Sequence, residues 1–148
     1  MKNFFLHTLI FTYYHKVGIN IILLYLIFIS AIFSQKTKQI HIEKANSLEY
    51  NVNLGKDVQR LIGDVVLRHD SILLYCDSAY FYSSSNNVDA YGNVHIKQSD
   101  TLNLYGDKLY YKGDKKIANI HGNVELVDNK IILTTDALFY DLNTKVAS

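Results

Sequence analysis

The sequence predicts an all-β fold made of long antiparallel strands that repeat in pairs. Two short motifs recur every 29 or 30 residues from position 63 onward. Apolar and polar residues alternate between these motifs, which is typical of half-buried β-strands. The chain of 148 residues also contains no proline and 12 tyrosines. This composition favours regular strands, because proline removes a ladder hydrogen bond and tyrosine fits a pleated surface well.

Two interleaved motifs define the repeat. The first is Gly-Asp/Asn-Val, which begins at Gly63, Gly92 and Gly122. The second is Asp-x-Ala/Leu-aromatic-aromatic, which begins at Asp77, Asp107 and Asp136. The distances from glycine to aspartate are 14, 15 and 14 residues, so the two motifs keep an almost constant offset. Self-similarity at a fixed period indicates stacked units, each of which is here one pair of strands.

The first element of the chain is an apolar segment at residues 1–34. No charged residue lies between Lys16 and Lys36, and the apolar run ends in the small residues Ser30, Ala31 and Ser34. This layout is typical of a secretory signal peptide that is cleaved after Ser34. An uncleaved N-terminal membrane anchor is the other interpretation, since about 20 apolar residues span a bilayer. Both interpretations export the second domain, residues 35–148.

The exported domain is expected to contain seven long strands, and its last residues begin an eighth. Their ranges are near 39–50, 58–68, 71–82, 87–97, 100–111, 116–126 and 129–140, with a new strand starting at 145. Short turns rich in Asn, Asp, Ser and Gly separate the strands. The glycine that would open the next repeat falls beyond Ser148. The domain is therefore expected to be truncated in the middle of a repeat.

The alternation of apolar residues slips by one position at each aspartate. Leu104 and Leu109, for example, flank Asp107 and are both expected to face inward. A β-bulge produces such a slip, so the aspartates are expected to form bulges or turns. Cys76 then occupies the same inward position as Gly106 and Thr135 in the other repeats. We therefore expect a buried thiol.

Charge and motifs argue against several classes of function. The 15 basic and 14 acidic residues leave a net charge of +1, so no nucleic-acid partner is expected. A single cysteine excludes a disulfide framework within the chain. His95 and His121 are expected on outward positions of separate strands, an arrangement that does not predict a metal site. The sequence contains no nucleophile or phosphate-binding motif. We expect no catalytic residues, no metal and no cofactor.

The repeats resemble the OstA-like family, which includes the LptA proteins of lipopolysaccharide transport. The resemblance lies in segments 92–96 and 107–111, and again in 122–126 and 136–140. Residues 40–50 resemble the first strand of the family, so the resemblance covers the exported domain. It implies an open β-jellyroll, a V-shaped stack of strands with an apolar interior.

The resemblance also implies a function without catalysis. A module of this kind binds lipid and bridges the inner and outer membranes, with the acyl chains of lipopolysaccharide on its inner face. The implied partners are lipopolysaccharide, other jellyroll domains of the transport system joined by edge-strand pairing, and further copies of the chain. The implied location is the periplasm, and membrane anchoring or outer-membrane association remains open. The alternative is a structural or adhesive β-repeat domain with a closed core that binds protein or carbohydrate.

The alternation selects the residues of the inner face. Those expected to contact lipid are Leu61, Val65, Leu67, Ile72, Leu74, Phe81, Val94, Ile96, Leu102, Leu104, Leu109, Tyr111, Ile120, Val124, Leu126, Ile131, Leu133, Leu138 and Tyr140. The structural marks of the repeat are Gly63, Gly92, Gly122, Asp77, Asp107 and Asp136. A packed core is the simpler explanation for an apolar face, and the sequence alone leaves both explanations open.

Overall fold

The structure is a computed structural model that describes residues 38–50, 55–129 and 131–148. The segment expected to be a signal peptide or anchor, residues 1–34, lies outside them. Within the described residues, no helix is long and apolar enough to cross a membrane. The strands are β1 (His41–Lys44), β2 (Ser47–Tyr50), β3 (Val58–His69), β4 (Ile72–Tyr82), β5 (Asn87–Gln98), β6 (Leu102–Lys112), β7 (Ile117–Asp128), β8 (Ile131–Asp141) and β9 (Val146–Ala147). A single 3-10 turn, Gly113–Lys115, joins β6 to β7.

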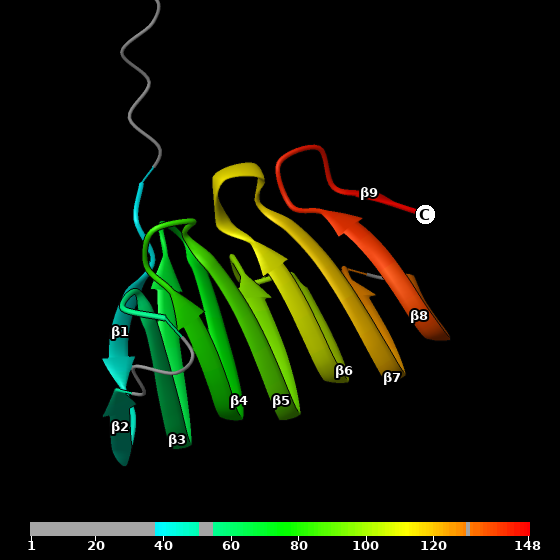
Figure 1. The fold of residues 1–148 in the computed structure, drawn as a ribbon. Helices are drawn as coiled ribbons and strands as arrows, with labels where there is room; N and C mark the ends of the chain where they lie inside the picture. Colours follow the sequence, from blue (N-terminus) through cyan, green and yellow to red (C-terminus); the bar gives the residue numbers. More distant parts are fainter. Residues whose placement is uncertain (1–37, 51–54, 130) are drawn as a thin grey trace, which may run out of the picture. The chain divides into compact units, whose positions relative to one another are not determined.

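The strands form one antiparallel sheet in which, from β3 to β9, neighbours in sequence are also neighbours in space (Figure 1). The order is β1-β3-β4-β5-β6-β7-β8-β9, and β2 also pairs with β3. The predicted stack of long antiparallel strands is confirmed. The first expected strand, 39–50, is instead two short strands, because the chain bends at Asn46. As a result, β1 pairs with the C-terminal end of β3, whereas β2 pairs with its N-terminal end.

A line of β-bulges crosses the sheet at the repeat motifs. Between β3 and β4 the register runs from Ile62 opposite Ser78 to Val65 opposite Cys76, so two residues of β3 face one of β4. The same shift recurs in each pair of neighbouring strands up to β8. The bulges explain the predicted slip in the alternation. The extra residue of each bulge lies in the strand that contains the glycine, and the aspartate lies opposite it in the neighbouring strand. Glycine is suited to the bulge because the backbone at this position has a positive φ, for example +77° at Gly122.

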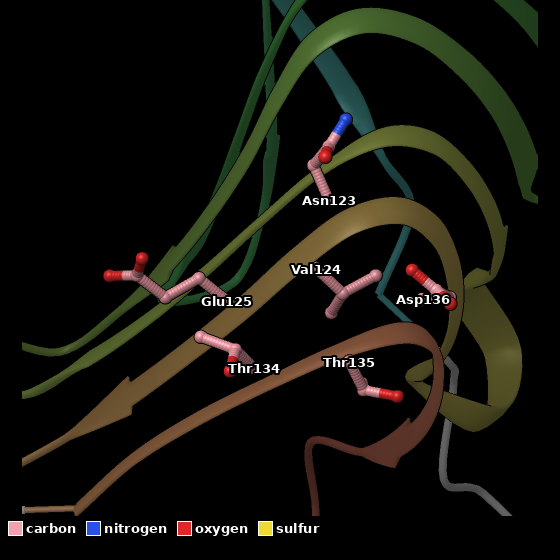
Figure 2. A pocket seen from close by; sticks show the side chains of 6 residues that line it. All are labelled: Asn123, Val124, Glu125, Thr134, Thr135 and Asp136. Atoms are coloured by element: carbon pink, nitrogen blue, oxygen red, sulfur yellow. The ribbon is translucent and has the colours of Figure 1, made fainter.

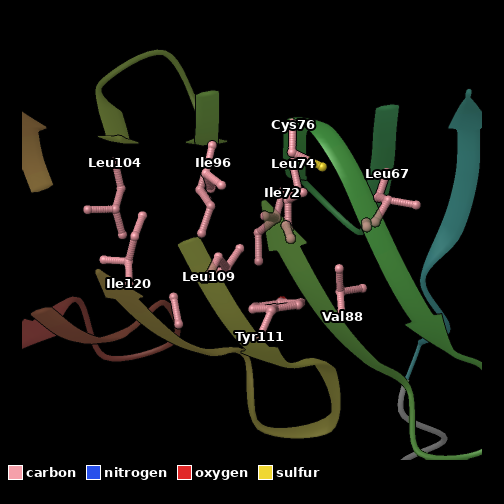
Figure 3. Packing of buried hydrophobic residues seen from close by; sticks show 14 of the residues in the cluster. Leu67, Ile72, Leu74, Cys76, Val88, Ile96, Leu104, Leu109, Tyr111 and Ile120 are labelled. Carbon is pink, nitrogen blue, oxygen red and sulfur yellow. The ribbon is translucent and has the colours of Figure 1, made fainter. Parts of the chain in front are cut away.

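The bulges divide the sheet into two walls. Wall 1 contains the strand halves 58–62, 78–82, 87–91, 108–112, 117–121 and 137–141. Wall 2 contains the halves 65–69, 72–76, 94–98, 102–106, 124–128 and 131–135. β2 and β9 extend wall 1, and β1 extends wall 2. We call the turn-bearing edges of the walls, at the strand ends far from the bulges, the rims. The inward apolar side chains of both walls form one core cluster, and Figure 3 shows them pointing toward one another.

Candidate functional site

Nearly all of the residues expected to line the inner face are buried between the walls. Leu61, Ile96, Leu104, Leu109 and Ile120, for example, have no exposed surface. The same holds, to within a few per cent, for Val65, Leu67, Ile72, Leu74, Phe81, Val94, Leu102, Tyr111, Val124, Leu126, Leu138 and Tyr140. For these residues the alternation of the sequence therefore identifies the inward side of the strands correctly.

Two of the expected inner-face residues are exposed. Ile131 and Leu133 have relative exposures of 67% and 39%. Both lie in the half of β8 that forms the edge of wall 2, and no described strand pairs with the far side of that half. Together with the neighbouring Ile132, which is 68% exposed, they make an apolar edge on wall 2. Their exposure follows from their place at the end of the sheet.

The interior is filled by the protein's own side chains. Behind Tyr111 and His69 the described structure leaves a cavity of about 10 Å³, lined by Ile40, Leu67, His69, Ile72, Leu74, Val88 and Tyr111. A space of this size holds about one water-sized sphere, which is too little for an acyl chain. Around this cavity the inward side chains of the two walls therefore pack against one another.

The repeat motifs hold the bend of the sheet. The carboxylate of Asp77 accepts a hydrogen bond of 2.9 Å from the amide of Asn93, and Asp107 accepts one of 2.8 Å from Asn123. These aspartates also lie directly against the glycines of the next strand. A Cβ placed at Gly92 would come within 2.3 Å of Asp77 Oδ2. Asp-Gly packing across the bulge therefore explains why both motifs recur together.

Asp136 is the last member of this series and has a different environment. It lines a shallow hollow of about 520 Å³ with Asn123, Val124, Glu125, Thr134 and Thr135 (Figure 2). The hollow lies between β7 and β8 at the open edge of the sheet, and its lining is mostly polar. It provides no apolar enclosure for a lipid chain.

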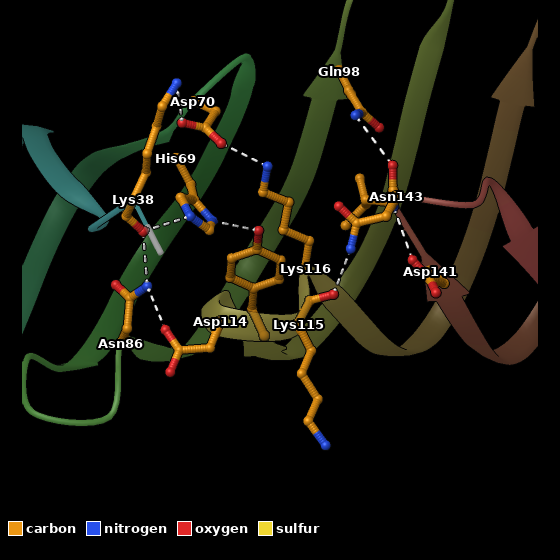
Figure 4. Close-up of polar contacts among 12 residues, drawn as sticks. Lys38, His69, Asp70, Asn86, Gln98, Asp114, Lys115, Lys116, Asp141 and Asn143 are labelled. Carbon is orange, nitrogen blue, oxygen red and sulfur yellow. Dashed lines mark hydrogen bonds and ion pairs between the residues drawn. The ribbon is translucent and has the colours of Figure 1, made fainter. Parts of the chain in front are cut away.

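A set of polar contacts joins the two rims, and of the residues that form it the sequence selects only Tyr111, as a residue of the inner face. His69 ends β3 in wall 2 and is only 3% exposed. The Tyr111 hydroxyl of wall 1 donates to His69 Nδ1 over 2.7 Å, and His69 Nε2 donates to the Lys38 carbonyl over 2.9 Å. Asp70, in the next turn of wall 2, pairs with Lys116 of wall 1 at 2.6 Å and with Lys38 at 3.0 Å. Figure 4 shows this network.

The electrostatics of the rim follow from burial and pairing. Burial lowers the pKa of His69 below its usual value of 6.5, although the Lys38 carbonyl and the charge of Asp70 act in the opposite direction. The hydrogen bond from Lys116 lowers the pKa of Asp70. Burial raises the pKa of Tyr111 above its usual range. Near neutral pH the rim therefore contains a neutral imidazole, a neutral phenol and an ionised Asp70.

Cys76 is buried, as expected. Its side chain is 5% exposed, and burial raises the pKa of its thiol to about 12. A thiol in this state is a poor nucleophile, because the thiolate is the reactive species. The histidines also occupy structural positions: the outward His95 stacks between Tyr75 and Tyr105. Among the described residues, no three His, Cys, Asp or Glu side chains are grouped to hold a metal ion.

Comparisons with known proteins agree with this geometry. The family model described as OstA-like protein matches residues 36–148. Among solved structures, the chain is similar to LptH from Pseudomonas aeruginosa, the LptA-homologous periplasmic component of the conserved lipopolysaccharide transport device. The TM-score is 0.66 at 17% sequence identity, and the match covers 78% of this chain and 84% of that chain. At this identity the likeness shows a shared fold. No curated protein matches the sequence significantly.

Proposed function

The chain belongs to the OstA-like family, and from this premise we propose that it is a non-enzymatic module of lipopolysaccharide transport in the periplasm. In this proposal the inner faces of the two walls hold acyl chains, and the module forms part of a bridge between the inner and outer membranes. The solved relative LptH is a periplasmic component of such a device. The periplasmic location rests also on the apolar segment at residues 1–34.

One observation carries the proposal: the space between the walls is lined almost entirely by apolar side chains. Among the buried side chains of the described residues, only His69 and Asn86 are polar, and both lie at the rims. A methylene group moved from water to such surroundings gains roughly 0.8 kcal/mol. Since an apolar lining forms no directional bonds, a bound acyl chain can also slide along it, as transport requires.

Binding requires the walls to separate. The cavity behind His69 and Tyr111 measures about 10 Å³, so an acyl chain that enters there must replace contacts that the two walls make with each other. Such an exchange has a moderate cost in free energy, because the lost contacts and the new ones are both apolar. The line of bulges supplies a place where the angle between the walls can change, since the strand ladders are already interrupted there.

The edge of wall 2 is the proposed site for partner domains. The 131–135 half of β8 has no pairing strand on its far side among the described residues, and β9 pairs only with Tyr140 and Asp141. An open strand edge offers unpaired backbone groups to another chain. The proposed partners are further jellyroll domains of the transport system or a second copy of this chain.

Photo-crosslinking tests the lipid-binding proposal. A benzophenone amino acid replaces Leu133, which faces inward at the open end and has room for it at 39% exposure. The matched control replaces Thr134, the next residue of β8, which points to the opposite face. After irradiation in cells, position 133 is expected to capture lipopolysaccharide and position 134 is not. Equal capture at both positions, or none at 133, would contradict the proposal.

The closed core supports a second candidate, a structural or adhesive β-repeat domain. Its outer surface carries exposed aromatic residues such as Tyr105 and Tyr110, which could contact protein or carbohydrate. The two candidates differ in where crosslinks form. Capture of protein or polysaccharide at positions 105 and 110, with no lipid at 133, would favour the adhesive domain.

A further inference from the structure

The contacts across the rims differ in kind from the contacts that hold each wall together. Within a wall, neighbouring strands share continuous backbone ladders, such as the one from Asn87–Lys112 to Tyr91–Lys108. Across the N-terminal part of the rims, the hydrogen bond from Tyr111 to His69 and the ion pair of Lys116 with Asp70 connect the walls instead. Opening the rims would therefore break side-chain contacts and leave the strand ladders intact.

The His69 contact depends on one particular arrangement of protons. The Lys38 carbonyl can only accept, so His69 Nε2 carries a hydrogen, and in the neutral ring Nδ1 accepts from Tyr111. Asn86 of wall 1 also holds this segment. Its side-chain amide donates to the Lys38 carbonyl over 3.1 Å, and its side-chain oxygen accepts from the Ile40 backbone N–H over 2.9 Å. Residues 38–40 thus lie as a strap between a turn of wall 1 and the end of β3.

The ion pairs lie nearer to water. The side chain of Asp70 is 17% exposed, and those of Lys116 and Lys38 are 28% and 76% exposed. Partly hydrated pairs contribute little net stability, because water replaces the lost partner when they separate. They can therefore open and close more readily than a buried pair.

A further hydrogen bond between the rims leaves one buried polar atom without a partner among the described residues. Gln98 at the end of β5 donates over 3.2 Å to the carbonyl of Leu142 in the wall 1 turn. Its side-chain oxygen is buried and has no hydrogen-bond partner among the described residues. A buried acceptor without a partner disfavours the closed state, and separation of the rims would expose it to water.

The small apolar cavity lies directly behind the histidine. His69 and Tyr111 are both part of its lining, together with Leu67, Leu74 and Val88. An alkyl chain that enters between the rims at this position reaches the apolar interior as soon as the His69–Tyr111 contact opens. The His69–Tyr111 contact between the rims therefore borders the small cavity in the interior.

We propose that Lys38, His69, Asp70, Tyr111 and Lys116 form a releasable clasp that holds the rims together, and that its opening admits the alkyl chain of a lipid to the interior. This inference rests on the proposed lipid-binding function and names the place of entry. The clasp residues position the walls and do not need to contact the bound lipid. The interior is protected from water when no lipid is present, which an apolar carrier in an aqueous compartment needs.

The test compares one protein in two states. Asp70→Cys and Lys116→Cys together remove the ion pair and place a thiol in each rim, and a flexible bis-maleimide then ties the rims covalently. Cys76 is 5% exposed and its thiol pKa is about 12, so it should not react. The probe is cis-parinaric acid, a straight-chain fatty acid that fluoresces in apolar surroundings. The Asp70→Cys single variant, treated with the same reagent, is the matched control.

We expect the untied double variant to bind the probe about two- to fourfold faster than the native protein, in keeping with the small contribution of a partly hydrated ion pair. Tying the rims should abolish uptake. Equal uptake in the tied and untied states would overturn the clasp as the route of entry. Asp70→Asn, which keeps the size of the side chain, provides a second variant should the cysteine pair fold poorly, and it should also accelerate uptake.

A distance measurement separates failure of the clasp from failure of the lipid-binding function. Spin labels at Asp100 and Lys112 report on the two ends of β6, which lie on opposite rims and are exposed. In the Asp70→Asn protein the distance distribution should shift to longer values without any lipid. If it shifts but no variant binds the probe, the lipid function is contradicted and the clasp is not. If it does not shift, the clasp is contradicted whatever the probe does.

Discussion

A single glycine in each repeat determines whether the sheet can bend. Gly122 has φ +77°, and a Cβ at this position would lie 2.4 Å from Asp107 Oδ2. The backbone conformation excludes most side chains, and the carboxylate of the neighbouring strand removes the remaining space. Glycine and aspartate therefore form one structural unit across the bulge. The hydrogen bond from Asn123 to Asp107 completes it.

Gly122→Ala tests this interpretation. We expect a loss of roughly 1–3 kcal/mol in the free energy of unfolding, because the left-handed backbone and the contact with Asp107 are both strained. Urea denaturation followed by circular dichroism measures it. Gly55→Ala is the matched control: its φ is also positive at +114°, but its Cβ would meet only Val58 Cγ2 at 3.5 Å. An equal loss in both variants would mean that the contact with Asp107 contributes nothing.

His69 makes stability depend on pH. Burial lowers its pKa in the folded protein below 6.5, so the unfolded chain binds more protons in this range. Stability from this group is complete above about pH 6.5 and is lost as the pH falls toward the folded-state pKa. The charges that face the ring are Asp70, Lys116 and Asp114, with the Lys38 carbonyl at Nε2. Protonation would also force Nδ1 to donate, which breaks the present hydrogen bond from Tyr111.

The expected result is a urea midpoint that falls as the pH is lowered from about 7 to about 5. In His69→Gln the side chain can still form hydrogen bonds but does not titrate, so this part of the pH dependence should disappear. Persistence of the same slope in the variant would assign the effect to another group.

Within the strands, the alternation of apolar and polar residues predicts which side chains are buried. The alternation places Leu104 and Leu109 on one side of β6 despite the slip at Asp107, and both are fully buried. Alternation is a property of the strand itself, so each repeat reports it independently. The split between β1 and β2 was missed, since Asn46 is only a weak copy of the repeated aspartate motif. It nevertheless packs against Gly63 as Asp77 packs against Gly92.

Contacts between walls were not predictable in the same way. His69 and Tyr111 are 42 positions apart and belong to different strands and different repeats. No motif links them, because the distance between the rims depends on the angle set by every bulge. The sequence likewise left open whether the inner face is a groove or a core. In the structure, side chains of the two walls fill that space.

The replacement Leu104→Asp tests the closed interior at the level of one strand. Leu104 has no exposed surface, so the new carboxylate would be buried without a partner. We expect a loss of at least about 4 kcal/mol and a largely unfolded protein, which the circular dichroism spectrum would report. Lys108→Asp, at an exposed position of the same strand, should leave the spectrum unchanged. A folded Leu104→Asp protein would show that water reaches the interior.

For the whole domain, the two requirements of a lipid carrier are met by different parts of the sheet. Among the described residues, the inward side chains of the walls are apolar, and the polar contacts between the walls lie at the rims. Stable ladders hold each wall, whereas bulges and side-chain contacts determine the angle between the walls. In the proposed function the angle between the walls changes while the strand ladders of each wall stay intact, which links the bulged repeat to the proposed transport.

The free end of wall 2 is the surface through which we propose that domains associate. Ile131, Ile132 and Leu133 are exposed together on a strand half that has no partner on one side among the described residues. An apolar strand edge of this kind favours pairing with another chain, and a lysine there disfavours it.

Ile132→Lys should weaken self-association roughly tenfold, as expected when one central apolar contact is lost. Sedimentation velocity over a range of concentrations measures this effect. Tyr110→Lys makes a similar change on β6, inside the sheet, and should leave association unchanged. If both variants behave like the native protein, the proposed role of this strand edge in association is contradicted.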